Sequence, residues 1–159
     1  MIGCGGAGKT SVANAIGARL GLPVVHIDGV FWRSLPNGRR VESAPAEWEA
    51  AHRSLIEERR WVIDGMKLGV LAERLGAADT VVFLDLPTWT CLWSVIRRDG
   101  LSLNREFVRW IARFRRVHRP RVLELLATCS CEVVMLRSRR DTRRFVAAIP
   151  PGSADRIAS

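Results

Sequence analysis

The stretch GCGGAGKT at residues 3–10 constrains the fold of this chain more than any other feature. It fits the pattern G-x-x-x-x-G-K-[ST], which is typical of loops that bind the phosphates of a nucleotide. Glycines let such a loop aim successive N–H groups at one anion, and the helix that follows adds the positive end of its dipole. Lys9 is one of only two lysines among 25 basic residues, so composition does not explain its place in the pattern. The alternative is a glycine-rich turn before a helix.

The pattern predicts a role for each residue of the loop. We expect Lys9 to act in catalysis by reaching the β- and γ-phosphates of ATP, and the Thr10 hydroxyl to coordinate Mg²⁺. The residues expected to contact the nucleotide here are Gly3, Gly5, Gly6, Ala7, Gly8, Lys9, Thr10 and Ser11.

A strand should precede the loop, because phosphate loops follow a central strand of about five residues. Only Met1 and Ile2 stand before Gly3. We therefore expect the native start several residues upstream, or a fragment, with the first strand largely missing from this chain.

Short apolar runs alternate with helical periodicities, which predicts an α/β fold with a parallel sheet. Strands are expected at residues 24–27, 61–64, 80–84 and 132–136. Helices are expected at residues 11–20, 45–58, 68–75, 88–98 and 105–118, with a last helix that begins at a capping box over 138–141. Residues 28–44 are expected to be irregular, and residues 99–104 to form a polar break.

Composition is consistent with one globular domain over residues 1–149 and a disordered tail over 150–159. The chain has 159 residues and no apolar run as long as a membrane span, and no secretory signal is visible. That absence of a long apolar run favours no membrane association. Four cysteines show neither a CxxC pair nor a zinc-binding spacing, which favours a reducing cytoplasm.

The formal charge of +9 favours nucleic acid or polyphosphate ligands, or it follows from an arginine-rich composition such as a GC-rich genome produces. The predicted helix 105–118 concentrates this charge. Its apolar stripe is Phe107, Trp110, Ile111, Phe114 and Val117. Its opposite face carries Arg105, Arg109, Arg113 and Arg116, which are either solvated or meet phosphates.

Three aspartates follow predicted strands. Asp64 is a candidate to hold Mg²⁺ through water, and the alternative is a turn aspartate. Asp28 is a candidate to orient or deprotonate a phosphate acceptor, and the alternative is an Asx turn with Gly29. Asp85 is interpreted as structural.

Because phosphoryl transfer spreads negative charge over the equatorial oxygens, cations must surround them, and the candidates are Arg74, Arg98, Arg113 and Arg116.

With these residues, the chain resembles a P-loop kinase of the adenylate kinase and shikimate kinase type. It is similar in particular to the family known as DNA topology modulation proteins, or adenylate-kinase-related ATPases. The resemblance runs from Gly3 to about Ile149. Its landmarks are GCGGAGKT and residues 22–28, 31–32, 61–65, 78–80, 84–87, 107–120 and 136–138.

The resemblance implies a three-layer P-loop NTPase fold with a five-stranded parallel sheet of order 2-3-1-4-5. It makes Asp64 similar to the aspartate that positions Mg²⁺, and Arg74 similar to the arginine that grips the acceptor phosphate. It places Arg98 at the start of a lid, Arg113 or Arg116 after the lid, and Arg137 beside the adenine.

Two departures from the family stand out. The family carries Asp-Gly-Asn-Tyr where this chain has Asp64-Gly65-Met66-Lys67, and its lid is often longer than residues 99–104. A lid excludes water and completes the charge cage around the phosphates. A short lid therefore favours slow ATP hydrolysis or simple nucleotide binding.

The expected function is that of a cytoplasmic ATP-binding protein that transfers the γ-phosphoryl group of MgATP to a small acceptor, such as a nucleoside monophosphate. Two alternatives stay open. One is a nucleic-acid-associated ATPase, and the other is a nucleotide-binding regulator without turnover.

Overall fold

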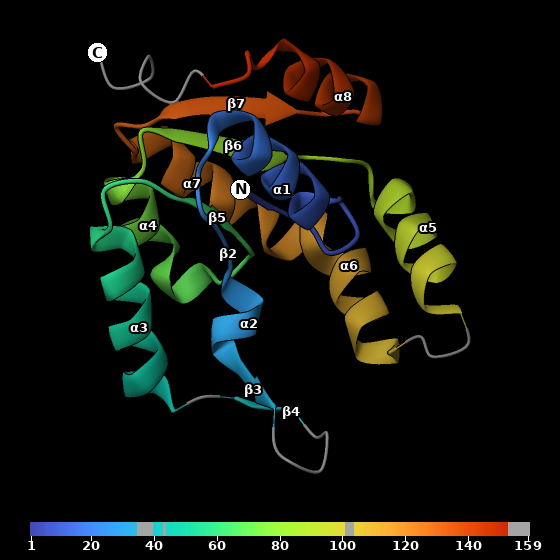
Figure 1. The fold of residues 1–159 in the computed structure, drawn as a ribbon. Helices are drawn as coiled ribbons and strands as arrows, with labels where there is room; N and C mark the ends of the chain where they lie inside the picture. Colours follow the sequence, from blue (N-terminus) through green and yellow to red (C-terminus); the bar gives the residue numbers. More distant parts are fainter. Residues whose placement is uncertain (35–39, 43, 101–103, 153–159) are drawn as a thin grey trace.

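The computed structural model describes residues 1–34, 40–42, 44–100 and 104–152 of the chain. Within them, parallel strands alternate with helices, so the predicted α/β class is confirmed (Figure 1). Part of the expected polar break at 99–104 and most of the expected tail at 150–159 lie outside the described residues.

Five short parallel strands form two sheets, and a separate hairpin is antiparallel. The parallel strands are β1 (Ile2–Gly3), β2 (Val24–His26), β5 (Val62–Asp64), β6 (Thr80–Leu84) and β7 (Glu132–Leu136). The order in one sheet is β1-β6-β7, and β2 pairs with β5 in the other. The hairpin joins β3 (Trp32–Ser34) to β4 (Arg40–Glu42). The bounds of β6 and β7 agree with the expected strands.

The two parallel sheets meet at Met1. Its backbone nitrogen donates to the Ile63 carbonyl oxygen over 2.7 Å, and the Gly65 N–H donates to the Met1 carbonyl oxygen over 3.2 Å. A parallel ladder makes this slanted pair of bonds around one residue, here Asp64, which lies between the two partners. Met1 therefore bridges the edges of β1 and β5.

Helices connect the strands, and several begin or end at residues with a clear local cause. They are α1 (Lys9–Leu20), α2 (Ile27–Phe31), α3 (Pro45–Glu57), a 3-10 turn η1 (Leu68–Val70) leading into α4 (Leu71–Ala77), α5 (Thr88–Asp99), α6 (Arg105–Val117), α7 (Arg119–Thr128) and α8 (Arg139–Ala148). Gly21, with a φ of 64°, ends α1. The Ser138 hydroxyl accepts from the Asp141 N–H, which is the first of the two hydrogen bonds of the predicted capping box of α8.

Helices cover both faces of the parallel strands. In Figure 1, α1 crosses in front of the strands with α8 beside it, and α7 runs behind them, in contact with α4 and α6. The main core joins the two sides through fully buried side chains of α1, β6, α4, α6 and α7, namely Ala13, Phe83, Leu71, Ile111 and Val122. These layers hold the carboxyl ends of β1 and β5 close to the first turn of α1.

A second, smaller core lies beside β5. Phe31 and Trp48 meet edge to face with ring centroids 5.5 Å apart, and Ile27, Ile63 and Val70 complete the cluster. Because Ile27 and Phe31 are four residues apart, burying both of them favours a helical turn there. The prediction that residues 28–44 are irregular is therefore wrong for the described part, which contains α2, β3 and β4.

Two further expectations about helices need correction. No helix is expected from the sequence over the residues of α7, although Pro120 stands in its first turn and Val122 and Leu126 are buried on one face. Val117, expected in the apolar stripe of α6, is 57% exposed, whereas Ile111 and Phe114 are buried as predicted.

The described start of the expected tail is attached to α1. The Gly152 N–H donates to the Arg19 carbonyl oxygen over 2.7 Å, and Arg19 Nη1 donates to the Ile149 carbonyl oxygen over 2.9 Å. In the described part of the chain, no helix is both long enough and apolar enough to span a bilayer.

Candidate active site

The predicted phosphate loop forms a tight turn between β1 and α1. The Ala7 N–H donates to the Cys4 carbonyl oxygen over 3.2 Å, and Gly8, with a φ of 92°, is the N-cap of α1. A φ in this range favours glycine. No side chain of the described residues caps α1. The N–H groups at the start of this helix are therefore not held by a capping side chain and can receive an anion.

Two glycines of the loop are also fixed by the helices that pack on it. A Cβ placed on Gly5 would lie 2.5 Å from Cζ of Phe107 in α6. One placed on Gly6 would lie 2.3 Å from the Cys91 carbonyl oxygen in α5. Both distances are too short for non-bonded atoms, so a larger residue would displace the ring of Phe107 at the first position and the backbone of α5 at the second.

Lys9 folds back over its own loop. Its Nζ donates to the Cys4 carbonyl oxygen over 3.0 Å. Burial lowers the pKa of Lys9, and the carboxylate of Asp28 opposes that shift more than any other neighbouring charge. The ammonium group of Lys9 is thus held beside the loop within the field of a carboxylate.

Asp64 joins the loop to the strand ends. Its Oδ2 accepts a hydrogen bond of 2.8 Å from the Thr10 hydroxyl, and its Oδ1 makes a very short contact with Nδ1 of His26. Asp64 is only 4% exposed. The register of β2 against β5 places His26 directly opposite Asp64. Sequence reasoning missed His26, although its position at the end of a strand next to Asp64 is a usable signal.

Arg74 brings a buried cation to the same end of β5. Its Nη2 donates to the Gly65 carbonyl oxygen over 3.0 Å, whereas its Nη1 has no hydrogen-bond partner among the described residues. The residue is 4% exposed, and burial lowers the pKa of its guanidinium to about 10, against the attraction of Asp64 and Asp28. A buried charged donor without an acceptor is costly. Arg74 is therefore prepared for an anionic ligand.

Asp28 completes the cluster. A Cβ placed on Gly65 would lie 3.6 Å from Oδ1 of Asp28, so this carboxylate stands next to the carbonyl group that Arg74 holds. Asp28 is exposed, lies in α2, and its side chain makes no hydrogen bond in the described part of the chain. The structure thus brings together Lys9, Thr10, Asp64, Asp28 and Arg74, and it shows no Asx turn at Asp28.

Three other predicted arginines lie apart from this cluster. Arg98 pairs with Asp99, with 2.6 Å from Nε to Oδ1, and Arg113 and Arg116 are exposed on α6. No hydrogen bond or ion pair of the described residues joins any of the three to the loop.

Asp85 makes a two-pronged ion pair with Arg119, at 2.8 and 2.7 Å, which agrees with its structural interpretation.

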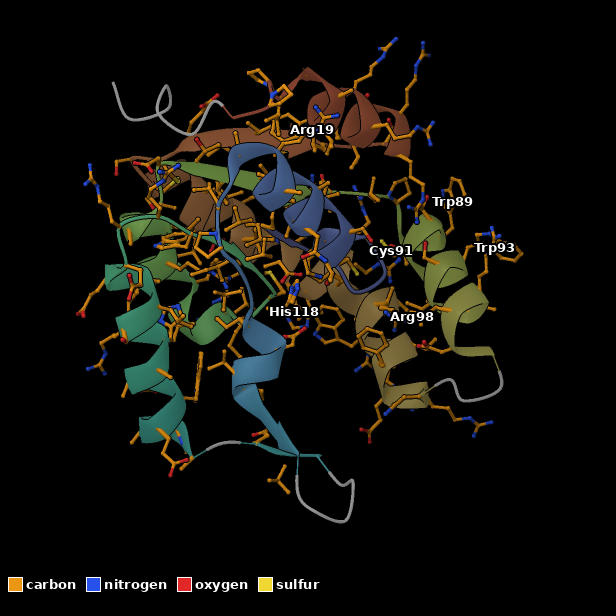
Figure 2. All side chains as sticks on the ribbon, viewed as in Figure 1. Arg19, Trp89, Cys91, Trp93, Arg98 and His118 are labelled. Atoms are coloured by element: carbon orange, nitrogen blue, oxygen red, sulfur yellow. The ribbon has the colours of Figure 1, made fainter. Side chains whose placement is uncertain are left out.

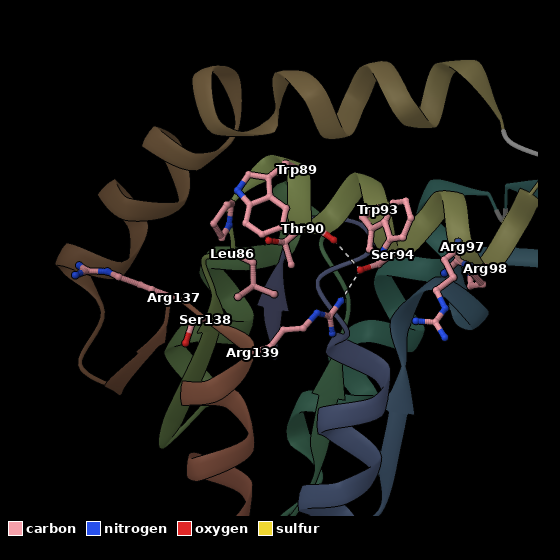
Figure 3. A pocket seen from close by; sticks show the side chains of 11 residues that line it. Leu86, Trp89, Thr90, Trp93, Ser94, Arg97, Arg98, Arg137, Ser138 and Arg139 are labelled. Carbon is pink, nitrogen blue, oxygen red and sulfur yellow. Dashed lines mark hydrogen bonds between the residues drawn. The ribbon is translucent and has the colours of Figure 1, made fainter.

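An open pocket of about 890 Å³ lies between α5 and the start of α8 (Figure 3). Arg137, expected beside the base of a nucleotide, is in its lining. Arg139 connects the pocket to the loop, because its Nη2 contacts the Ser94 hydroxyl at very short range, and a Cβ placed on Gly8 would lie 4.0 Å from its Nη1. Figure 2 shows Trp89 and Trp93 on the outer side of α5. Sequence reasoning missed both tryptophans as well as Arg139.

Comparisons with known proteins do not assign the chain. No protein-family model matches it, and no curated protein matches it. The geometry of the site is therefore the basis on which a function can be inferred.

Proposed function

We propose that the protein binds MgATP at residues 3–10 and transfers its γ-phosphoryl group to a small acceptor, such as a nucleoside monophosphate. The observation that carries this proposal is the 2.8 Å hydrogen bond from Thr10 to Asp64, which are 54 residues apart in sequence. A phosphate loop needs a carboxylate at this place to help hold Mg²⁺. A glycine-rich turn with only a structural role has no need of one.

The assignment to the P-loop kinases of the adenylate kinase type is part of the same proposal. The two hydrogen bonds of Met1 favour one continuous sheet with the order β2-β5-β1-β6-β7. Counting only the parallel strands, this is the order 2-3-1-4-5. Ligands of such open sheets bind at the carboxyl ends of the strands, where the loop and Asp64 lie.

The loop would hold the β- and γ-phosphates through its N–H groups and the uncapped start of α1. Lys9 Nζ would exchange the Cys4 carbonyl oxygen for phosphate oxygens, because an anionic acceptor makes the stronger hydrogen bond. The carboxylates of Asp28 and Asp64 oppose the lowering of the Lys9 pKa that burial causes, so they favour the charged form of the lysine beside the phosphates.

The residues at the loop fit a Mg²⁺ ion that arrives with the nucleotide. Thr10 and Asp64 offer oxygen atoms, which Mg²⁺ prefers. Both oxygens of Asp64 already have protein partners, so this carboxylate fits a metal-bound water better than the metal itself. The described residues contain no group of three or more ligating side chains. Mg²⁺ usually takes its other ligands from water and phosphates, and when bound it neutralises phosphate charge.

The acceptor would bind at Arg74 and Asp28. An acceptor phosphate would satisfy Nη1 of Arg74, the buried donor that the described residues leave without a partner. Asp28, next to Gly65, would orient a hydroxyl group of the acceptor or accept its proton. Arg98, Arg113 and Arg116 are the candidates to neutralise charge on the transferred group. Because no hydrogen bond or ion pair of the described residues joins them to the loop, they would have to approach it when ligand binds.

The test is a transfer assay with γ-labelled ATP, Mg²⁺ and a panel of nucleoside monophosphates and small metabolite alcohols. We expect label on one acceptor, and a loss of rate of about 10²–10³-fold or more in Lys9→Ala. Arg109→Ala, an exposed cation on α6, is the matched control and should keep the rate.

Label released only as free phosphate would contradict the kinase assignment and favour an ATPase whose partner is missing. Adding DNA to the assay would test whether DNA is that partner. An absence of ATP binding would contradict the whole proposal. Binding is measured independently by thermal unfolding, because ATP at 100 times its Kd should add about 2.7 kcal/mol to the free energy of unfolding.

A further inference from the structure

Two tryptophans of α5 stand in water beside the candidate site. Trp89 is 72% exposed and Trp93 is 63% exposed, and both line the pocket next to the loop. Residues four apart on a helix lie on the same face, so the two indoles are neighbours along the pocket (Figure 3). Exposed aromatic surface of this size indicates a ligand that covers it.

The pocket lies where the nucleoside end of a bound nucleotide would be. Arg139 contacts Ser94, which is in the lining of the pocket. The other end of its guanidinium group lies near Gly8, at the N-terminus of α1. A ligand with its phosphates at Lys9 and Thr10 would therefore pass Arg139 and direct its other end toward the indoles. The arginine is placed to contact the part of the ligand nearest the phosphates.

The chemistry of the lining favours stacking over recognition of one particular base. Its charged side chains are all guanidinium groups, those of Arg97, Arg98, Arg137 and Arg139, and its described lining includes neither a carboxylate nor a side-chain amide. Asparagine and glutamine make the two-pronged contact with adenine, and acidic side chains accept from the amino group of cytosine, whereas hydroxyl groups such as those of Thr90, Ser94 and Ser138 contact either base. Aromatic faces accept every base, because each base has a π-face.

We infer that Trp89 and Trp93 form a stacking surface for the base of the nucleotide bound at the loop, and that this subsite accepts different bases with similar affinity. The inference rests on the proposed function. A base could also come from a nucleic-acid strand. The connection of the pocket to a single phosphate loop through Arg139 favours a mononucleotide.

The experiment compares nucleotides with the phosphate chain alone. Isothermal titration calorimetry in the presence of Mg²⁺ would give the Kd of ATP, GTP, CTP, UTP and inorganic tripolyphosphate for the wild type, Trp89→Ala and Trp93→Ala. Ile96→Ala is the matched control, because Ile96 is 47% exposed on the same helix and is not part of the lining. Thermal unfolding of each variant checks that it folds.

We expect the wild type to bind ATP more tightly than tripolyphosphate, and to bind the four nucleotides within about tenfold of one another. Each tryptophan variant should weaken ATP binding by about 5- to 150-fold, the range for losing one stacked base. The affinity for tripolyphosphate should not change, and Ile96→Ala should resemble the wild type.

Three results would overturn the inference while leaving the proposed function intact: an unchanged preference for ATP over tripolyphosphate in both tryptophan variants, no such preference in the wild type, or selection of one base by more than about 100-fold. If the tryptophan variants lost affinity for a dT15 oligonucleotide but kept their affinity for ATP, the tryptophans would be assigned to binding a nucleic-acid strand. If the wild type bound neither ATP nor tripolyphosphate, the proposed function itself would fail, and the inference with it.

Discussion

The protein has two cationic regions that differ in almost every physical respect. Arg74 is buried at the end of β5, near Asp64 and Asp28, with one donor left without a partner in the described structure. The four arginines on the outer face of α6 are exposed, and none of them makes an ion pair with a described residue. They are Arg105, Arg109, Arg113 and Arg116.

The difference shows that burial, more than the number of cations, marks a candidate site. Removing a guanidinium from water costs much free energy unless acceptors surround it, whereas a solvated arginine costs little. A net charge of +9 is therefore weak support for any one partner, because much of it lies on surfaces such as α6. A single buried arginine with an unused donor is the stronger indication.

The largest expected effect concerns this buried cation. Arg74→Met should lower the rate of phosphoryl transfer by about 10²–10³-fold, because an oriented charged donor is lost. Its free energy of unfolding should change by no more than about 1–3 kcal/mol, because the relief from burying a guanidinium group is opposed by the loss of the hydrogen bond to the Gly65 carbonyl oxygen. Transfer kinetics and urea unfolding would measure the two quantities. Arg109→Met, on α6, is the matched control and should change neither.

Burial would not mark Arg74 as part of a site if Arg74→Met destabilised the protein but kept its activity per folded molecule. Arg74 would then be a structural cation that holds the Gly65 carbonyl group, and the acceptor would have to bind elsewhere.

A smaller effect is expected from a second buried group near Arg74. His52 is fully buried in α3, neither ring nitrogen has a hydrogen-bond partner in the described structure, and its Nδ1 lies 3.7 Å from Oε2 of Glu73. Burial lowers the pKa of His52 from its usual 6.5, helped by the positive charges of Arg74 and Arg53 and opposed by Glu73. Below about pH 6.5 the unfolded chain therefore binds a proton that the folded protein excludes.

The free energy of unfolding of the wild type should consequently fall as the pH drops from about 7 through the folded-state pKa of His52. The slope is at most about 1.36 kcal/mol per pH unit. His52→Leu should lack this contribution, so the difference between the two proteins, measured by urea unfolding at several pH values, should change with pH. A constant difference would show that His52 does not exclude the proton.

The smallest effect is expected on the exposed face of α6. Arg105 and Arg109 are like charges four residues apart, and Arg105 stands at the positive end of the helix dipole. Replacing both with Gln should raise the free energy of unfolding by about 0.2–0.5 kcal/mol at low salt. The gain should vanish near 1 M salt, where screening acts over about 3 Å. A decrease of more than about 1 kcal/mol in the free energy of unfolding would show that Arg105 and Arg109 make stabilising interactions on this face.

The local sequence pattern was enough to predict the elements that are marked by an apolar run or by a capping residue. The apolar runs of β6 and β7 have the predicted bounds, and the capping residue of α8 forms the predicted hydrogen bond. The stretch 28–44 could not be predicted in this way, because α2 depends on burying Ile27 and Phe31 against Trp48 of a later helix. Tertiary packing there outweighs weak local preference.

The candidate site divides in the same way. The motif identified Lys9 and Thr10, and a carboxylate at a strand end identified Asp64, because these depend on short spacings. The position of His26 opposite Asp64 depends on the register between two strands. The exposure of Trp89 and Trp93 depends on how the rest of the chain packs around α5. Neither property is encoded near the residue itself. Tryptophans on a helix are more often buried, so their pattern alone did not indicate a surface.

The packing of α5 and α6 on the loop has a consequence for how such a sequence changes over generations. Gly5 and Gly6 are required by Phe107 and by the Cys91 carbonyl group, whether or not a ligand ever binds. Within the described structure Lys9 has no comparable restraint, since its Nζ makes a single hydrogen bond there, to the Cys4 carbonyl oxygen. A descendant that lost its ligand would keep the glycines and drift first at the lysine. In a lineage of such proteins, the lysine is the residue that reports whether the loop is still in use.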